Sequence, residues 1–295
     1  MKTPQRITSL AVLILPLALT GCSLFPTTRH LPVPKAPPTV LTATPSQLVD
    51  RLNQRWDALH TLTATVEIQA TENKTAQGVQ KAFPSARGYI LLRKPKMLRV
   101  LGQYFGVRIF DMASDGNHFT LDIPPKNMAI EGTNTVTEKS SNPLENLRPD
   151  FFMDAMVVRG LTPDDHYSVT ADSDILEDTS RKHLYSVPEY EVSITREKPN
   201  SREEIPVRVI TIHRSDLLPY AQQLYDVEGN LETQITYSNY ANFNGNQFPS
   251  KVTIRRPKEG IELVLSVERV EENVNLADDQ FQVKIPAGTK IRTLR

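Results

Sequence analysis

Residues 61–70 read TLTATVEIQA, and this stretch decides the fold class. Every second side chain from Leu62 to Ala70 is apolar, and the side chains between them are threonine, glutamate or glutamine. A period of two is that of a β-strand with one buried face and one face in water. The stretch therefore predicts a half-buried strand of an antiparallel sheet.

The segment before this strand predicts an amphipathic helix. Residues 44–47, Thr-Pro-Ser-Gln, offer a capping threonine, a proline for the first helical position and a glutamine three residues after the cap. Leu48, Leu52 and Trp56 follow at helical spacing on one face. We expect a helix from Pro45 to about His60, with Trp56 as a core anchor or as part of a cavity wall.

Short β-rich segments follow in two series, one up to residue 131 and one from residue 190 to 267. Between them, Asn142 and Pro149 are helix-start signals, and residues 162–180 are polar and acidic, which is typical of a loop. The total is about eleven strands with two helical insertions and no βαβ rhythm. We predict a mainly β fold, a curved antiparallel or barrel-like sheet, rather than an α/β fold.

The amino terminus has the layout of an export signal. Lys2 and Arg6 precede an apolar run over residues 10–19, and small residues follow at Thr20 and Gly21. A membrane-spanning helix needs about 20 apolar residues, and this run is roughly half as long. We expect residues 1–21 to be a signal peptide that is removed.

Residues 19–22, Leu-Thr-Gly-Cys, resemble the lipobox of bacterial lipoproteins. That resemblance implies cleavage between Gly21 and Cys22, a diacylglycerol on the Cys22 thiol and an acyl chain on its new amine; the alternative is an ordinary cleavage site with a chance cysteine. Cys22 is the only cysteine, so the chain has no internal disulfide. The rule for such lipoproteins retains those with Asp after the cysteine in the inner membrane, so Ser23 implies an outer-membrane anchor facing the periplasm.

The mature chain divides into a tether and one folded part. Residues 22–44 are rich in proline and predict an extended tether, and residues 45–295 form the predicted domain. Without Lys2 and Arg6 the chain has 32 basic and 34 acidic residues, a formal charge of −2. Such a balance provides no positive field for nucleic acid, so we expect a membrane partner through the lipid anchor.

Motifs for catalysis or metal binding are absent from the sequence. The six histidines show no metal-ligand spacing, and there is no nucleophile elbow, Walker loop or dinucleotide-binding fingerprint. The acidic cluster around Asp164, Asp172 and Asp178 lacks the glycine and glutamate of an EF-hand loop, so we interpret it as a solvated loop. We predict a non-enzymatic protein with no metal and no cofactor other than the acyl groups on Cys22.

The order helix, strands, helices, strands resembles the LolA/LolB-like family over residues 45 to about 290. The motifs that carry the resemblance are residues 88–95 running into 97–100, the turn at 113–116, the paired strands within 224–252, and the ending around Phe281 and Pro286. The family's fold is a half-open β-barrel capped by helices, shared by a lipoprotein carrier, its receptor and lipid-binding lipoproteins. The resemblance implies an apolar inner face that lid helices, a partner or an acyl chain must cover.

This resemblance implies a lipoprotein that binds a lipid or lipoprotein acyl chain and takes part in transport to the outer membrane. The alternatives are a scaffold lipoprotein with a filled core that acts through protein contacts, and a hydrolase with a Ser/His/acid set dispersed in the sequence. The same apolar residues serve a cavity or a closed core. The candidate cavity and lid residues are Leu48, Leu52, Trp56, Leu98, Val100, Leu101, Phe105, Phe151, Phe152, Met153 and Met156.

Overall fold

The computed structural model describes residues 39–74, 78–134, 148–178 and 183–294. The predicted signal peptide, with Gly21, Cys22 and most of the tether, lies outside these ranges, as does the predicted helix start at Asn142. The described end of the tether is attached to the domain, because Leu41 N donates to Arg214 O at 2.7 Å and Ala43 N to the Tyr190 hydroxyl at 3.1 Å. No helix in the described ranges has the length and apolar character needed to cross a membrane.

The first helix forms where its capping sequence predicts it. α1 (Pro45–Ala58) begins after Thr44, whose side chain accepts from Gln47 N while the Gln47 side chain accepts from Thr44 N. Leu48, Val49 and Leu52 form its buried stripe. The helix thus presents one apolar face to the sheet, as its periodicity predicts.

The strands come in two series on either side of the short helix α2 (Pro149–Met156). The first series is β1 (Thr61–Lys74), β2 (Val79–Ala82), β3 (Ala86–Arg93), β4 (Met97–Tyr104), β5 (Val107–Ser114), β6 (His118–Ile123) and β7 (Met128–Thr133), with the 3₁₀ turn η2 (Pro124–Lys126) before β7. The second series is β8 (His166–Asp178), β9 (His183–Glu197), β10 (Glu204–His213), β11 (Pro219–Tyr225), β12 (Leu231–Phe243), β13 (Asn246–Arg256) and β14 (Ile261–Glu272), followed by η4 (Asp278–Phe281) and β15 (Lys290–Thr293).

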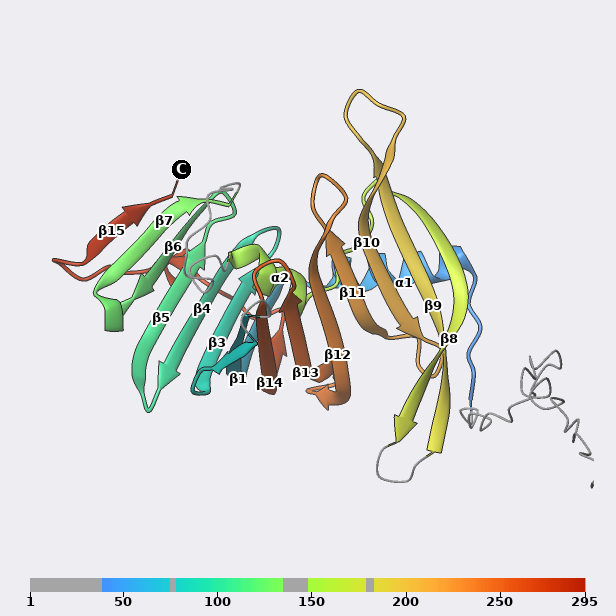
Figure 1. Ribbon diagram of the computed structural model, residues 1–295, viewed down its shortest axis with the longest axis horizontal. Coiled ribbons are helices and arrows are strands. Elements are labelled where there is room, and N and C mark those ends of the chain that lie inside the picture. Colours follow the sequence, from blue (N-terminus) through green and yellow to red (C-terminus); the bar gives the residue numbers. More distant parts are fainter. Residues whose placement is uncertain (1–38, 75–77, 135–147, 179–182, 295) are drawn as a thin grey trace, which may run out of the picture.

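All strands belong to one 15-stranded sheet that curves and does not close (Figure 1). Its order is β15-β7-β6-β5-β4-β3-β1-β14-β13-β12-β11-β10-β9-β8, with β2 added beside β1. Strands β1 and β14 join the two series, pairing antiparallel from Leu62 opposite Glu272 to Glu72 opposite Ile261. Among the strands that the structure describes, only β15 and β7 pair in parallel. The prediction of a mainly β, curved antiparallel sheet is therefore confirmed.

Two apolar clusters lie on the helix-covered face of the sheet. The first gathers buried side chains from β1, β3 to β7 and β12 to β14 around α2, including Ile90, Val100 and Leu265. The second packs Leu48 and Leu52 of α1 against β9 and β10, including Val192 and Ile210. Each helix thus covers its own part of the concave face.

Three strands were not predicted from the sequence, so the described chain has more strands than the expected eleven. Residues 166–178, interpreted as loop, form β8, which pairs with β9 from His166 opposite Thr195 to Asp178 opposite His183. β8 is the last strand at its edge of the sheet, and most of its side chains are exposed, so the apolar alternation that marks a half-buried strand is missing. β2 and β15 have only four residues each, which is too short for a periodic signal.

Candidate functional site

Helix α2 separates two different cavities. Pro149 occupies its first turn and Asp150 provides an acidic side chain there, which suits the start of a helix. Its inner side is apolar and buried, with Phe152, Met153 and Met156 in the first cluster. Its outer side carries Asp150, Phe151 and Asp154, which line a hollow of about 680 Å³.

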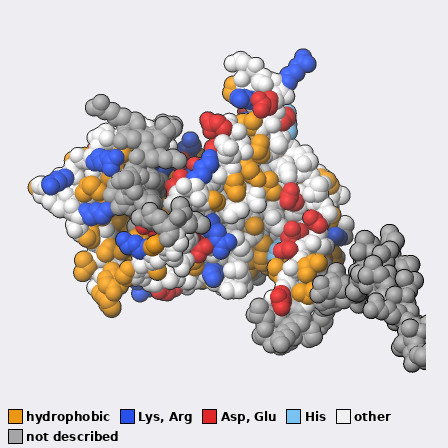
Figure 2. All heavy atoms as spheres, viewed as in Figure 1, with side chains coloured by type: hydrophobic (Ala, Val, Ile, Leu, Met, Phe, Trp, Pro, Cys, Tyr) orange, Lys and Arg blue, Asp and Glu red, His pale blue; other side chains and the backbone are white. Residues whose placement is uncertain are grey.

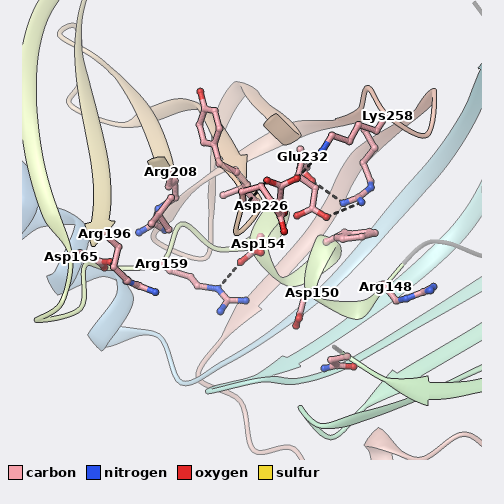
Figure 3. Close-up of a pocket in the computed structure, with 18 of the residues that line it drawn as sticks. Arg148, Asp150, Asp154, Arg159, Asp165, Arg196, Arg208, Asp226, Glu232 and Lys258 are labelled. Carbon is pink, nitrogen blue, oxygen red and sulfur yellow. Dashed lines mark hydrogen bonds and ion pairs between the residues drawn. The ribbon is translucent and has the colours of Figure 1, made fainter. Parts of the chain in front are cut away.

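We call this hollow the polar cavity (Figure 3). Acidic and basic side chains intermingle on its wall. The wall is built by α2, the segment after it and strands β9 to β13. Most of these charges are arranged in pairs. The cationic lining residues are Arg148, Arg159, Arg196, Arg208, Arg256 and Lys258, and the acidic ones are Asp150, Asp154, Asp165, Asp226, Glu228, Glu232 and Glu259.

One end of the polar cavity is built around Arg256. Its guanidinium lies 3.4 Å from the centre of the Phe151 ring and pairs with Glu232 at 3.1 Å and Glu259 at 3.2 Å. Lys258 pairs with Asp226 at 2.7 Å. Burial works to raise the pKa of Asp226, but hydrogen bonds from Lys258 and Asn230 outweigh it and lower the pKa to about 2. This end is a closed network of charges.

The other end contains three arginines. Arg159 pairs with Asp154 at 2.6 Å, and Arg196 pairs with Asp165 at 2.6 Å. Burial raises the pKa of Asp154, although the charge of Arg159 works to lower it. Arg208 donates from Nη2 to the Gly160 carbonyl at 3.2 Å, and burial lowers its pKa.

A second hollow, of about 280 Å³, lies where the ends of the two helices meet the β12–β13 hairpin. We call it the apolar cavity, because hydrophobic side chains of α1, β1, the end of α2 and β13 make up much of its wall. Leu52 and Met156 both reach it, from α1 and α2 respectively. Tyr237 also lines it, and its hydroxyl accepts from Gln222 Nε2 at 2.6 Å. Burial raises the pKa of Tyr237 well above its usual value, so the hydroxyl stays neutral.

A third hollow, of about 1080 Å³, adjoins the apolar cavity at Tyr237 and Tyr240. The His213 ring stacks on the Tyr220 ring in its wall, with centroids 3.6 Å apart. Burial lowers the pKa of His213, which favours the neutral imidazole. Within the described ranges, no three His, Cys, Asp or Glu side chains are placed to hold a metal ion.

The structure distributes the sequence-predicted cavity residues over several places. Leu98, Val100, Phe152, Met153 and Met156 lie in the first cluster, with Trp56 packed against it, and Leu48 and Leu52 lie in the second. Of the residues expected to meet between the two helices, Leu52 and Met156 come together at the apolar cavity.

Three predicted residues lie outside these two clusters. Leu101 is on the opposite face of β4 from the buried Leu98 and Val100. Phe105 is 90% exposed in the β4–β5 turn, where its φ is 46°. Phe151 is half-buried on the outer side of α2, under Arg256. An apolar residue type alone did not reveal on which side of a strand or helix each would fall.

The arginines of the polar cavity were missed, although the sequence contains a signal for two of them. Arg208 alternates in phase with the buried Ile210 and Ile212 on β10, and Arg256 in phase with Ile254 on β13. A cation at a position that the strand period assigns to the interior points to a buried polar site. Asp154 and Arg159 offer no comparable pattern.

Comparisons with known proteins bear on the fold. No protein-family model and no curated protein sequence matches the chain. A solved LolA superfamily protein from Nitrosomonas europaea is 15% identical, with a TM-score of 0.51 over 82% of this chain and 99% of that one. A DUF1329 family protein from Desulfovibrio piger is 15% identical, with a TM-score of 0.49 over 80% and 94% of the two chains.

At this level of identity, structural similarity establishes a shared fold only. The match covers 82% of this chain and 99% of the Nitrosomonas protein, so it is not limited to one hairpin motif. The expected resemblance to the LolA/LolB-like architecture is therefore confirmed at the level of the backbone. This chain has a LolA-like fold.

Proposed function

We propose that the protein is an outer-membrane-anchored lipoprotein that binds a lipid or lipoprotein acyl chain on its concave face and takes part in lipoprotein or lipid transport to the outer membrane. The observation that carries the proposal is the apolar cavity between the ends of α1 and α2 on a LolA-like sheet. Ligand cavities combine apolar walls with a few placed polar groups. Here Leu52, Leu62 and Met156 line the cavity together with Arg55, Gln247 and Glu272.

The cover over the first cluster is suited to movement. α2 has only eight residues, and helices so short depend on packing for their stability. Met153 and Met156 make up part of its buried side, and methionine adapts its shape to different neighbours. A shift of α2 away from β4 and β13 would extend the apolar cavity into the core. An acyl chain would then replace the contacts that α2 gives up.

Binding of this kind needs no catalytic group, so the proposal is non-enzymatic. Transfer between two such cavities requires only a difference in affinity and an entrance that opens. The lipobox-like residues 19–22 support an anchor on Cys22, and Ser23 supports the outer membrane.

The main experiment uses the mature chain with Cys22→Ser, exported through an ordinary secretory signal so that it lacks its own acyl groups. Native mass spectrometry with lipid extraction should find a stoichiometric co-purified lipid. Val158→Phe, which fills the apolar cavity from its wall, should remove that lipid. Ile175→Phe, at a 55% exposed position on β8, is the matched control and should retain it. If the Cys22→Ser protein with its native Val158 co-purified without any lipid, the proposal would be refuted.

The anchor is tested separately by cell fractionation. The native chain should sediment with the outer membrane, and Cys22→Ser should move it to the soluble periplasmic fraction, because the acyl chains supply the membrane affinity. Native protein in the inner-membrane fraction would contradict the assignment to the outer membrane.

A second candidate function is a scaffold that acts through protein contacts. The observation that favours it is β8, an edge strand with exposed Tyr167, Ile175 and Leu176. Acidic side chains gather over the β8 to β10 end of the molecule (Figure 2). An exposed edge strand is a site where another chain can pair. An empty apolar cavity together with loss of a partner on Ile175→Lys would favour this function.

A further inference from the structure

Arg208 is a buried cation without a carboxylate partner among the described residues. Its side chain lines the polar cavity and the residue is only 7% exposed. Its one hydrogen bond within the described ranges goes from Nη2 to the Gly160 carbonyl, and Nε has no hydrogen-bond partner. The carboxylates of its end of the cavity, Asp154 and Asp165, pair with other arginines.

A buried charge without a partner is unfavourable unless something compensates it. Removing a guanidinium from water costs several kcal/mol, and a single backbone carbonyl returns only part of this. Burial lowers the pKa of Arg208, although the charges of Asp154 and Asp165, which pair directly with other arginines, work to raise it. Arginine nevertheless remains protonated in proteins, so a bound anion would stabilise the buried positive charge of Arg208.

The surroundings of Arg208 favour an anion at this end of the cavity only. Arg159, Arg196 and Arg208 face two carboxylates here, those of Asp154 and Asp165 (Figure 3). At the opposite end acidic groups outnumber Arg256 and Lys258. The cavity's volume of about 680 Å³ leaves room for a ligand beside Arg208.

We propose that the Arg208 end of the polar cavity binds an oxyanionic group, a phosphate or carboxylate, with Arg208 as its principal ligand. The guanidinium presents a planar set of donors that matches such groups. The free Nε would become a donor to the anion. Arg159 and Arg196 add positive charge nearby while remaining paired.

This inference goes beyond the acyl-chain proposal and does not depend on it. Between the two cavities lies the buried Gln222, whose Nε2 donates both to the Tyr237 hydroxyl and to the Asp154 carbonyl. A lipid headgroup would place its anionic group beside Arg208. A free anion would occupy the same end of the polar cavity without a chain.

The test measures binding of inorganic phosphate and of a short-chain phosphatidylglycerol by calorimetry, with matching thermal melts. The native protein should bind at least one of the two probes. Arg208→Gln removes the charge while retaining a donor, and it should weaken binding about tenfold or more, whereas Arg208→Lys should retain part of the affinity. Lys251→Gln removes one charge at an exposed position of β13 outside the polar cavity and should leave binding unchanged.

The two probes distinguish the source of the anion. Binding of inorganic phosphate itself indicates a free-ion site, and binding of the lipid alone indicates a headgroup site. In the absence of any anion, Arg208→Gln should melt at a higher temperature than the native protein, because an uncompensated charge has been removed. The proposal would be overturned if folded Arg208→Gln bound each probe as tightly as the native protein does. It would also be overturned if the native protein bound neither probe. The binding data on the native protein decide the question if the variant does not fold.

Discussion

The two sides of α2 make different kinds of contact with the rest of the protein. On the inner side Phe152, Met153 and Met156 are almost completely buried among apolar neighbours. On the outer side Phe151 and Asp154 face a cavity where the contacts are ion pairs and a cation–π contact. The comparison teaches that one short helix can serve two purposes. Its inner side contributes folding free energy, and its outer side forms part of the charged wall of the polar cavity.

The strongest test of this difference is a pair of neighbouring substitutions. Phe152→Ala should lower the free energy of unfolding by about 3–5 kcal/mol, because it leaves a cavity in a closed core. Phe151→Ala should lower it by roughly 0.5–2 kcal/mol, since it removes mainly the contact with Arg256. Urea denaturation followed by circular dichroism measures both. Equal losses would mean that the two sides of α2 are equally important for folding.

A second pair tests whether the contrast between inner and outer sides extends to the sheet. Val100 is completely buried, and Leu101 lies on the other face of β4. Val100→Thr keeps the shape but buries a hydroxyl, which should cost about 1–3 kcal/mol of unfolding free energy. Leu101→Thr should cost less than about 1 kcal/mol, because its side is partly in contact with water. If Leu101→Thr lowered the free energy of unfolding more than Val100→Thr does, the face of β4 opposite the helices would be the more buried one.

This pair also shows how far sequence reasoning reached. The alternation over residues 61–70 predicts β1 correctly because one of its faces is fully buried, so the chemistry of its side chains follows the geometry of the strand. In β4, Leu98 and Val100 point to one face and Leu101 to the other, and only the packing of α2 against β4 decides which face is inside. β8 contains no contrast at all, because both of its faces are largely exposed.

The candidate site was harder to predict than the fold for a related reason. The apolar residues of a cavity wall and of a closed core are the same residue types, so Leu52 and Met156 could be named but not distinguished from Leu48 and Met153. The polar cavity joins α2 with five strands, β9 to β13, that lie far away in sequence. In the sequence, only Arg208 and Arg256 indicate this cavity, because each lies on the same strand face as buried apolar neighbours, on β10 and β13 respectively.

The smallest expected effect concerns the pair of Asp226 and Lys258 in the polar cavity. The pKa of Asp226 is lowered to about 2, against roughly 3.9 in an unfolded chain. A lowered folded-state pKa stabilises the protein above the unfolded value, and this contribution is lost as the pH falls towards the folded value. Asp226→Asn should therefore be less stable than the native protein above about pH 4, by no more than about 1 kcal/mol because water screens the pair, and the difference should vanish near pH 2. Urea denaturation at a series of pH values measures it. A difference in stability that stays constant over this pH range would assign the effect to lost packing instead of charge. The wall of the polar cavity that faces the outer side of α2 would then be stabilised by shape as well as by ion pairs.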